Sequence, residues 1–262
     1  MSSARPQRTD AALSASEPEA DTPPRRGARV EARELCRRFG RHVALDGVSL
    51  AIEPGETFGL LGANGAGKTT FIRLVTGYLL PTSGRVAVDG LSPDTDAQAV
   101  HARLGFVPET SRLYPDLRVR SFLRFCGGVR GMRGEALEEA VERVIARMAL
   151  RAVADRLIGN LSKGYQQRVS LAQGFLHDPA LLIVDEPTSG LDPRQRAEVR
   201  SILAEVRGRR TVLLCTHDLL EARELAQRVG ILSRGRLVAV GPAEEVLGGE
   251  NPLDLFRSEE LS

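Results

Sequence analysis

One short segment, Gly62 to Thr70 with the sequence GANGAGKTT, constrains the fold of this chain more than any other. It fits the pattern Gly-x-x-x-x-Gly-Lys-Thr of a phosphate-binding loop, which joins a strand to a helix. Glycines at positions 62, 65 and 67 let the backbone turn tightly and bring its N–H groups close to phosphate oxygens. Lys68 adds positive charge, Thr69 offers a hydroxyl to Mg²⁺, and the following helix points its N-terminal dipole at the anion. The segment predicts a bound nucleotide.

The lysine content of the chain supports this interpretation. Lys68 and Lys163 are the only lysines, so arginine makes up the remaining 34 of the 36 basic residues. Because arginine serves wherever a surface cation is enough, we expect a retained lysine to have a specific task. Taken without its context, the Gly-x-x-x-x-Gly-Lys-Thr pattern could also be a glycine-rich turn that binds no ligand.

Length and composition exclude several classes of protein. With 262 residues and 42% hydrophobic content, the chain can bury a large core, as one sizeable domain or two small lobes. A formal charge of +2 does not favour nucleic acid as a partner. The three cysteines, Cys36, Cys126 and Cys215, lack metal-ligand spacing, which indicates a reducing compartment. No run reaches the ~18 to 20 apolar residues that cross a bilayer, and the N-terminus has no signal-like apolar segment.

In the first half of the chain, several segments alternate apolar and polar residues as strands do. Residues 1–28 are rich in Ala, Ser, Pro and mixed charge, which predicts a disordered tail. The two segments before the phosphate loop are expected to pair at a sheet edge. We expect strands at residues 30–36, 48–52, 57–61, 85–89 and 105–109, the last one ending at Glu109.

The second half begins with a helical lobe. Apolar residues at helical spacing predict helices at 117–129 and 135–150, and Ser162 can cap a further helix. Residues 181–184 form a continuous apolar run, as in a strand buried on both faces, and 211–216 repeats this arrangement. We expect a hairpin at residues 231–238 and no identifiable chemistry in the polar tail.

Charged residues follow the two apolar strands. Asp185 and Glu186 end the first strand and His217 ends the second. Buried carboxylates are costly unless they serve a metal or a bound water, and the tip of a parallel sheet is where ligands bind. Phe39, the first aromatic residue, could stack on an adenine or pack in the core, and these two interpretations remain open. His42, His101 and His177 match no motif and are expected to be surface or packing histidines.

Five motifs in order resemble those of the ATP-binding cassette ATPases, over roughly Val30 to Val246. These are the phosphate loop, the sequence LSKGY at 161–165, the strand ending at Asp185 and Glu186, the sequence SGLD at 189–192, and His217. The resemblance implies an α/β fold: a P-loop NTPase core with a mainly parallel sheet, an antiparallel β subdomain and an inserted helical subdomain at about 110–170. It places the ATPase domain at 29–247, between a tail at 1–28 and a polar tail at 248–262.

The resemblance also implies roles for individual residues. Phe39 would stack on adenine, Lys68 would hold the β- and γ-phosphates, Glu186 would polarise the attacking water, and His217 would contact the γ-phosphate. Thr69, Glu109 and Asp185 would bind Mg²⁺, Asp185 through water. The remaining residues expected to bind ATP are Gly62, Ala63, Asn64, Gly65, Ala66, Gly67, Thr70, Ser162, Lys163, Gly164 and Asp192.

Three positions depart from the commonest pattern of that family. Glu109 stands where the family usually has Gln, which contacts Mg²⁺ and reports the nucleotide state to the membrane subunit. A carboxylate keeps a Mg²⁺ ligand at this position and adds a negative charge beside the phosphate. Lys163 replaces Gly, and its side chain points either at the partner's phosphates or into solvent. Tyr165 replaces Gln and cannot reproduce the hydrogen bonds of an amide.

The resemblance implies the function as well. We expect the ATPase subunit of an ABC transporter, similar to bacterial exporters, at the cytoplasmic face of the cell membrane. One partner would be a transmembrane permease, docked in a groove between Glu109 and the helical lobe, around Tyr114 to Phe125; the alternative is that the apolar residues there are ordinary core. The other partner would be a second copy of the chain that shares two ATP, with Ser162 and Gly164 reaching the partner's γ-phosphate. The alternative is a soluble, non-transport cassette acting mechanically on ribosomes or DNA.

Overall fold

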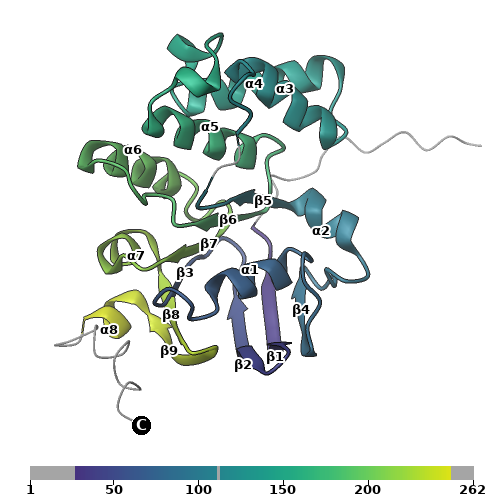
Figure 1. Cartoon of the computed structure of the whole chain (residues 1–262), viewed down its shortest axis with the longest axis vertical. Helices are drawn as coiled ribbons and strands as arrows, with labels where there is room; N and C mark the ends of the chain where they lie inside the picture. Colours follow the sequence, from purple (N-terminus) through teal and green to yellow (C-terminus); the bar gives the residue numbers. More distant parts are fainter. Residues whose placement is uncertain (1–26, 111–112, 249–262) are drawn as a thin grey trace, which may run out of the picture.

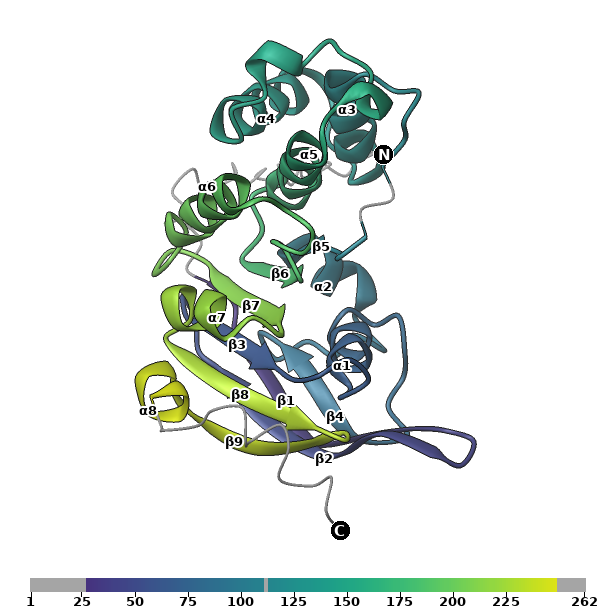
Figure 2. The ribbon, with the colours of Figure 1, turned by 60° about the vertical axis from the view of Figure 1, so that its left-hand side comes forward.

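The computed structural model describes residues 27–110 and 113–248 (Figure 1). It contains two sheets and a group of helices at one end of the molecule (Figures 1 and 2). The strands are β1 (Val30–Phe39), β2 (His42–Ile52), β3 (Thr57–Leu61), β4 (Ser83–Val88), β5 (Leu104–Val107), β6 (Leu181–Asp185), β7 (Thr211–Thr216), β8 (Arg228–Ser233) and β9 (Arg236–Pro242). The helices are α1 (Lys68–Val75), α2 (Ala97–Arg103), α3 (Val119–Val129), α4 (Gly134–Arg147), α5 (Lys163–Phe175), α6 (Pro193–Ala204), α7 (Leu219–Leu225) and α8 (Ala243–Leu247), with 3-10 turns at Arg151–Val153 and Ile158–Asn160.

The larger sheet has the strand order β5-β6-β7-β3-β8-β9 and is parallel except for β9. Every residue of β3, β6 and β7 is buried, as expected for apolar strands covered on both faces. The prediction of a sheet edge at 48–61 is wrong for β3, which lies between β7 and β8. A strand without a polar face is most stable in the interior of a sheet, so the phosphate loop emerges from its middle.

The smaller sheet is antiparallel, with the order β2-β1-β4. Here β2 does lie at an edge, and β1 extends beyond the predicted strand to Phe39. The β1–β2 pairing is irregular at several points, one of them beside Glu34, which has a positive φ of 46°. The tip of this hairpin projects from the body of the molecule (Figure 2). Its register sets Phe39 opposite His42.

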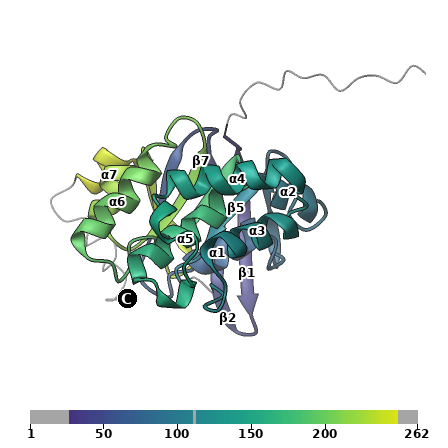
Figure 3. The ribbon, with the colours of Figure 1, turned by 90° about the horizontal axis from the view of Figure 1, so that it is seen from above.

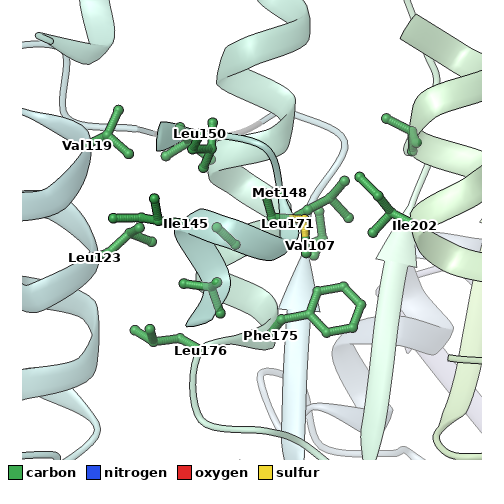
Figure 4. Packing of buried hydrophobic residues seen from close by; sticks show 14 of the residues in the cluster. Val107, Val119, Leu123, Ile145, Met148, Leu150, Leu171, Phe175, Leu176 and Ile202 are labelled. Atoms are coloured by element: carbon green, nitrogen blue, oxygen red, sulfur yellow. The ribbon is translucent and has the colours of Figure 1, made fainter. Parts of the chain in front are cut away.

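The predicted helical lobe is present as α3, α4 and α5, which lie together above the larger sheet (Figures 1 and 3). Buried side chains from the three helices, among them Leu123, Ile145 and Leu171, meet in one apolar cluster that reaches Val107 of β5 (Figure 4). The lobe therefore shares its core with the sheet rather than folding apart from it. No helix in the described ranges has the length and apolar character needed to cross a membrane.

The domain begins slightly earlier than the sequence suggests. Gly27 and Ala28, which we assigned to the disordered tail, are buried. The Ala28 N–H donates to the Ala180 carbonyl at 3.2 Å, and the Thr211 hydroxyl donates to the Ala28 carbonyl at 2.6 Å. These bonds fix the chain beside the larger sheet. The predictions for 1–26 and 249–262 concern segments outside the described residues.

Candidate functional site

The phosphate loop connects β3 to α1, and close packing explains two of its glycines. A Cβ at Gly62 would lie 2.5 Å from the Leu232 carbonyl oxygen, and one at Gly67 would lie 2.7 Å from the Ala44 carbonyl oxygen. Gly67 also has a φ of 113°, which only glycine adopts readily. It occupies the N-cap of α1 and carries no capping side chain, so the first N–H groups of the helix are available to an anion.

A cavity of about 290 Å³ lies over this loop. Its walls come from the hairpin tip of β1 and β2, from the phosphate loop, and from the carboxyl ends of β5 and β6. The lining residues are Phe39, His42, Ala44, Ala63, Asn64, Gly65, Gly67, Lys68, Thr69, Thr70, Glu109, Asp185 and Glu186. The structure therefore brings most of the residues expected to bind nucleotide and Mg²⁺ together from distant parts of the chain.

The Lys68 side chain is only 7% exposed and lies folded over the loop. Its ammonium donates to the carbonyl oxygens of Gly62, at 2.5 Å, and Ala63, at 3.4 Å. It also lies 3.7 Å from Oε1 of Glu186. These contacts place one positive charge between the phosphate loop and the tip of β6.

Glu186 adopts a backbone conformation that is rare for a residue with a side chain. Its φ is 47°, and its N–H donates to the Cys215 carbonyl of the neighbouring strand at 2.8 Å. Such strained positions cluster at functional sites. The conformation turns the carboxylate toward β7, where Nδ1 of His217 lies 2.9 Å from Oε2 and the Thr216 hydroxyl donates to the same oxygen at 3.4 Å.

The acidic residues at this edge repel one another. Burial raises the pKa of Asp185 to about 6, and the negative charges of Glu186 and Glu109 add to the shift, while Lys68 opposes it. A divalent cation would relieve this repulsion, and the Thr69 hydroxyl and two carboxylates are ligands that Mg²⁺ accepts. Within the described part of the chain, no three His, Cys, Asp or Glu side chains form a metal site by themselves. The donor set fits Mg²⁺ bound through few carboxylates and substrate phosphates.

Phe39 lies beside the cavity with 43% of its surface exposed. The Arg37 guanidinium lies 4.6 Å from the centre of its ring. This exposure excludes the interpretation of Phe39 as a core residue. A ring at the mouth of a phosphate site has the right place to stack on the base of a nucleotide.

Six residues expected to bind nucleotide, all within the described ranges, do not line the cavity: Gly62, Ala66, Ser162, Lys163, Gly164 and Asp192. His217, expected to contact the γ-phosphate, does not line it either. Ser162 occupies the N-cap of α5, yet its side chain makes no capping hydrogen bond to that helix, contrary to expectation. The Asp192 carboxylate caps α6 by accepting from the Gln195 N–H at 2.9 Å. A Cβ at Gly164 would lie 2.5 Å from Cδ of Gln195, so the starts of α5 and α6 are in close contact.

Two residues that line the cavity were missed. His42 and Ala44 belong to β2, and no motif marks them. They lie at the cavity because the hairpin register places His42 opposite Phe39. The approach of the Ala44 carbonyl to Gly67 has no signal in the sequence of either segment.

Comparisons with known proteins agree on one family. The model of the ABC transporter family matches residues 45–189. The chain is 39% identical over 218 residues to the probable multidrug ABC transporter ATP-binding protein YbhF of Escherichia coli (strain K12), covering 83% of this chain and 38% of that protein. It is 37% identical over 233 residues to the Nod factor export ATP-binding protein I of Paraburkholderia xenovorans (strain LB400), covering 87% of this chain and 76% of that protein. The chain thus spans well under half the length of the first of these relatives.

Solved structures share the fold. The chain matches cbiO1 from Clostridium perfringens, part of the ABC transporter complex cbiONQ, with a TM-score of 0.77 and 27% identity, over 88% of this chain and 95% of that one. It matches the ATP-binding cassette MJ0796, a dimer in a post-hydrolysis state bound to ADP and Pi, with a TM-score of 0.73 and 25% identity, over 82% of this chain and 98% of that one.

Proposed function

The chain belongs to the ABC transporter family, and we propose that it is the ATP-binding and ATP-hydrolysing subunit of an exporter. The observation that carries this proposal is the meeting of Lys68, Asp185, Glu186 and His217 at one edge of the larger sheet. The named relatives include a multidrug protein and a Nod factor export protein, which supports export over import.

Each residue at this edge has a role in phosphoryl transfer, which depends on positioning and charge neutralisation. The loop N–H groups and Lys68 bind the β- and γ-phosphates. Glu186 orients and deprotonates the attacking water, and His217 keeps the Glu186 carboxylate in place from the tip of β7. Thr69, Asp185 and Glu109 would hold Mg²⁺, which would neutralise phosphate charge.

A second copy of the chain completes the site. Ser162, Lys163 and Gly164 lie outside the cavity of their own chain, and the α5 N-terminus has no side-chain cap. Its free N–H groups and dipole suit an anion supplied from another molecule. We assign these residues, with Asp192 beside them, to the γ-phosphate bound by the partner. The dimeric neighbour bound to ADP and Pi supports this arrangement.

The permease has a separate docking surface. A cavity of about 990 Å³ opens between α2, β5 and α3, and the exposed side chains of Tyr78, Phe125 and Val129 border it. Exposed apolar groups of this size around a hollow are typical of protein contacts. An apolar segment of a membrane partner would fit here, which would hold the chain at the cytoplasmic face of the membrane. The surface overlaps the predicted one only in part: Phe125 lines the cavity, whereas Tyr114 and Phe122, which pack on each other, do not.

The proposal is tested by ATP hydrolysis of the purified chain with Mg²⁺. We expect Lys68→Ala to lower the rate at least about 100-fold while circular dichroism stays unchanged, because the lysine serves the phosphates. Arg194→Ala is the matched control, since this side chain is 90% exposed on α6. Equal rates for the parent and Lys68→Ala would contradict the proposal.

A further inference from the structure

A glutamate on α7 is completely buried although no motif marks it. Glu221 is 0% exposed and lies one helical turn after Asp218, the N-cap of α7. Burying a carboxyl group in a protein core costs free energy unless it is hydrogen-bonded or paired. The position of this one is informative, because α7 begins directly after His217.

The surroundings of Glu221 join two loops of the site. The hydroxyl of Thr216, the last residue of β7, and the hydroxyl of Thr188, just after Glu186, lie beside its carboxyl group and oppose the rise in pKa that burial causes. Asp218 on the same helix adds to the rise, and Arg200 of α6 acts against it. Both carboxyl oxygens are buried and neither meets hydrogen-bond geometry with a described residue, so the Thr216 and Thr188 hydroxyls are polar neighbours of the group and not fixed partners.

The hydrogen bonds of Thr216 show what this carboxyl group can control. A hydroxyl has one proton to donate, and that of Thr216 goes to Oε2 of Glu186 at 3.4 Å. The hydroxyl oxygen of Thr216 in turn accepts from the Asp218 N–H at 3.0 Å. An ionised Glu221 would compete with Glu186 for the Thr216 proton, whereas a protonated Glu221 is a donor and leaves that proton to Glu186. The buried, raised-pKa environment favours the protonated form.

We propose that Glu221 is a positioning residue for ATP hydrolysis, whose buried carboxyl group packs between the Thr188 loop and the Thr216–His217 loop and leaves the Thr216 hydroxyl directed to Glu186. Arg200 reinforces the arrangement from α6, since it lies 3.6 Å from Asp218 and 2.8 Å from Glu224. Through these contacts α6 and α7, which lie side by side in Figures 1 and 2, keep the tips of β6 and β7 in register. This inference rests on the proposed ATPase function.

The test compares Glu221→Gln with Glu221→Leu in the full chain. The amide of Gln keeps one donor and one acceptor, so we expect kcat within about twofold of the parent. Leucine fills the space without polar groups, and such replacements often keep or raise stability. For Glu221→Leu we expect an unchanged Tm, a KM for ATP within about twofold, and a kcat lowered about 10- to 100-fold, because the water-activating carboxylate loses its orientation.

The pH profile gives a readout that a merely structural role would not move. The parent should lose activity at high pH as Glu221 ionises, and Glu221→Gln should lack that loss. Glu245→Gln, an exposed position on α8, is the control for removing a glutamate charge. If Glu221→Leu fails to fold, the comparison of pH profiles between the parent and Glu221→Gln is sufficient to test the inference.

The inference is overturned if Glu221→Leu keeps the parent kcat, or if the Gln variant and the parent have the same pH profile. That result differs from a failure of the proposed function. In the latter case the parent itself would show no hydrolysis that depends on Lys68.

Discussion

Nδ1 of His217 lies 2.9 Å from Oε2 of Glu186. The contact forms because β6 and β7 are adjacent parallel strands, so the residues that follow them meet at one edge of the sheet. The sequence predicted that His217 contacts the γ-phosphate, and the structure places it against Glu186, the carboxylate expected to activate water. We propose that the two residues act together in hydrolysis.

The exposed ring of Phe39 gives a prediction about the nucleotide base. Phe39→Ala should raise the KM for ATP about 2- to 10-fold, the loss expected for one stacking contact, with kcat nearly unchanged. Phe39→Trp should restore the parent KM. Steady-state kinetics measure both, and Tyr114→Ala, which removes an aromatic side chain that is 53% exposed, is the control. An unchanged KM in Phe39→Ala would show that the base binds elsewhere.

Glu109 adds a negative charge to the acidic edge of the cavity. In Glu109→Gln we expect retained ATP hydrolysis with half-maximal activation at a higher Mg²⁺ concentration, because an amide oxygen is a weaker ligand than a carboxylate. Titration of the rate with Mg²⁺ measures the shift. A loss of activity larger than that of Lys68→Ala would contradict the role of a Mg²⁺ ligand.

The raised pKa of Asp185 predicts how pH affects stability. Its ordinary value of 3.8 rises to about 6 in the fold. A carboxyl group with a raised folded pKa contributes stability that is present below pH 3.8 and lost as pH rises through 6, about 3 kcal/mol in total. The Asp185→Asn side chain does not titrate. The Tm of this variant, measured relative to the Tm of the parent, should therefore rise as the pH increases from 4 to 7. Thermal melts without nucleotide or Mg²⁺ measure this, and a pH-independent Tm difference would contradict it.

The parts of the site that the sequence predicted are those determined locally. The glycine spacing of the phosphate loop, the apolar run before Asp185 and the run before His217 each carry their signal within a few residues. Because parallel strands end at the same edge, their terminal residues could be expected to meet.

The parts that could not be predicted depend on pairing and packing between distant segments. His42 reaches the cavity through the hairpin register, which is irregular in β1. Glu221 resembles any helical glutamate in the sequence, and only the packing of α7 against neighbouring elements buries it. The central place of β3 likewise follows from the strand order, which no local pattern encodes.

The central claim is that Glu186 drives hydrolysis at a site completed by a second chain. Glu186→Gln keeps a similar shape and removes the basicity needed to activate water, so ATP should bind while turnover fails. Since ATP would be shared by two chains, the stalled variant should accumulate as a dimer.

Size-exclusion chromatography with light scattering on Glu186→Gln tests this claim most directly. With ATP and Mg²⁺ we expect twice the mass of the 28.4 kDa chain, and with ADP the mass of a monomer. Adding Ser162→Arg, which blocks the γ-phosphate contact of the partner, should restore the monomer in ATP. A Glu186→Gln variant that stays monomeric in ATP and hydrolyses it at the parent rate would contradict both the role of Glu186 and the shared site.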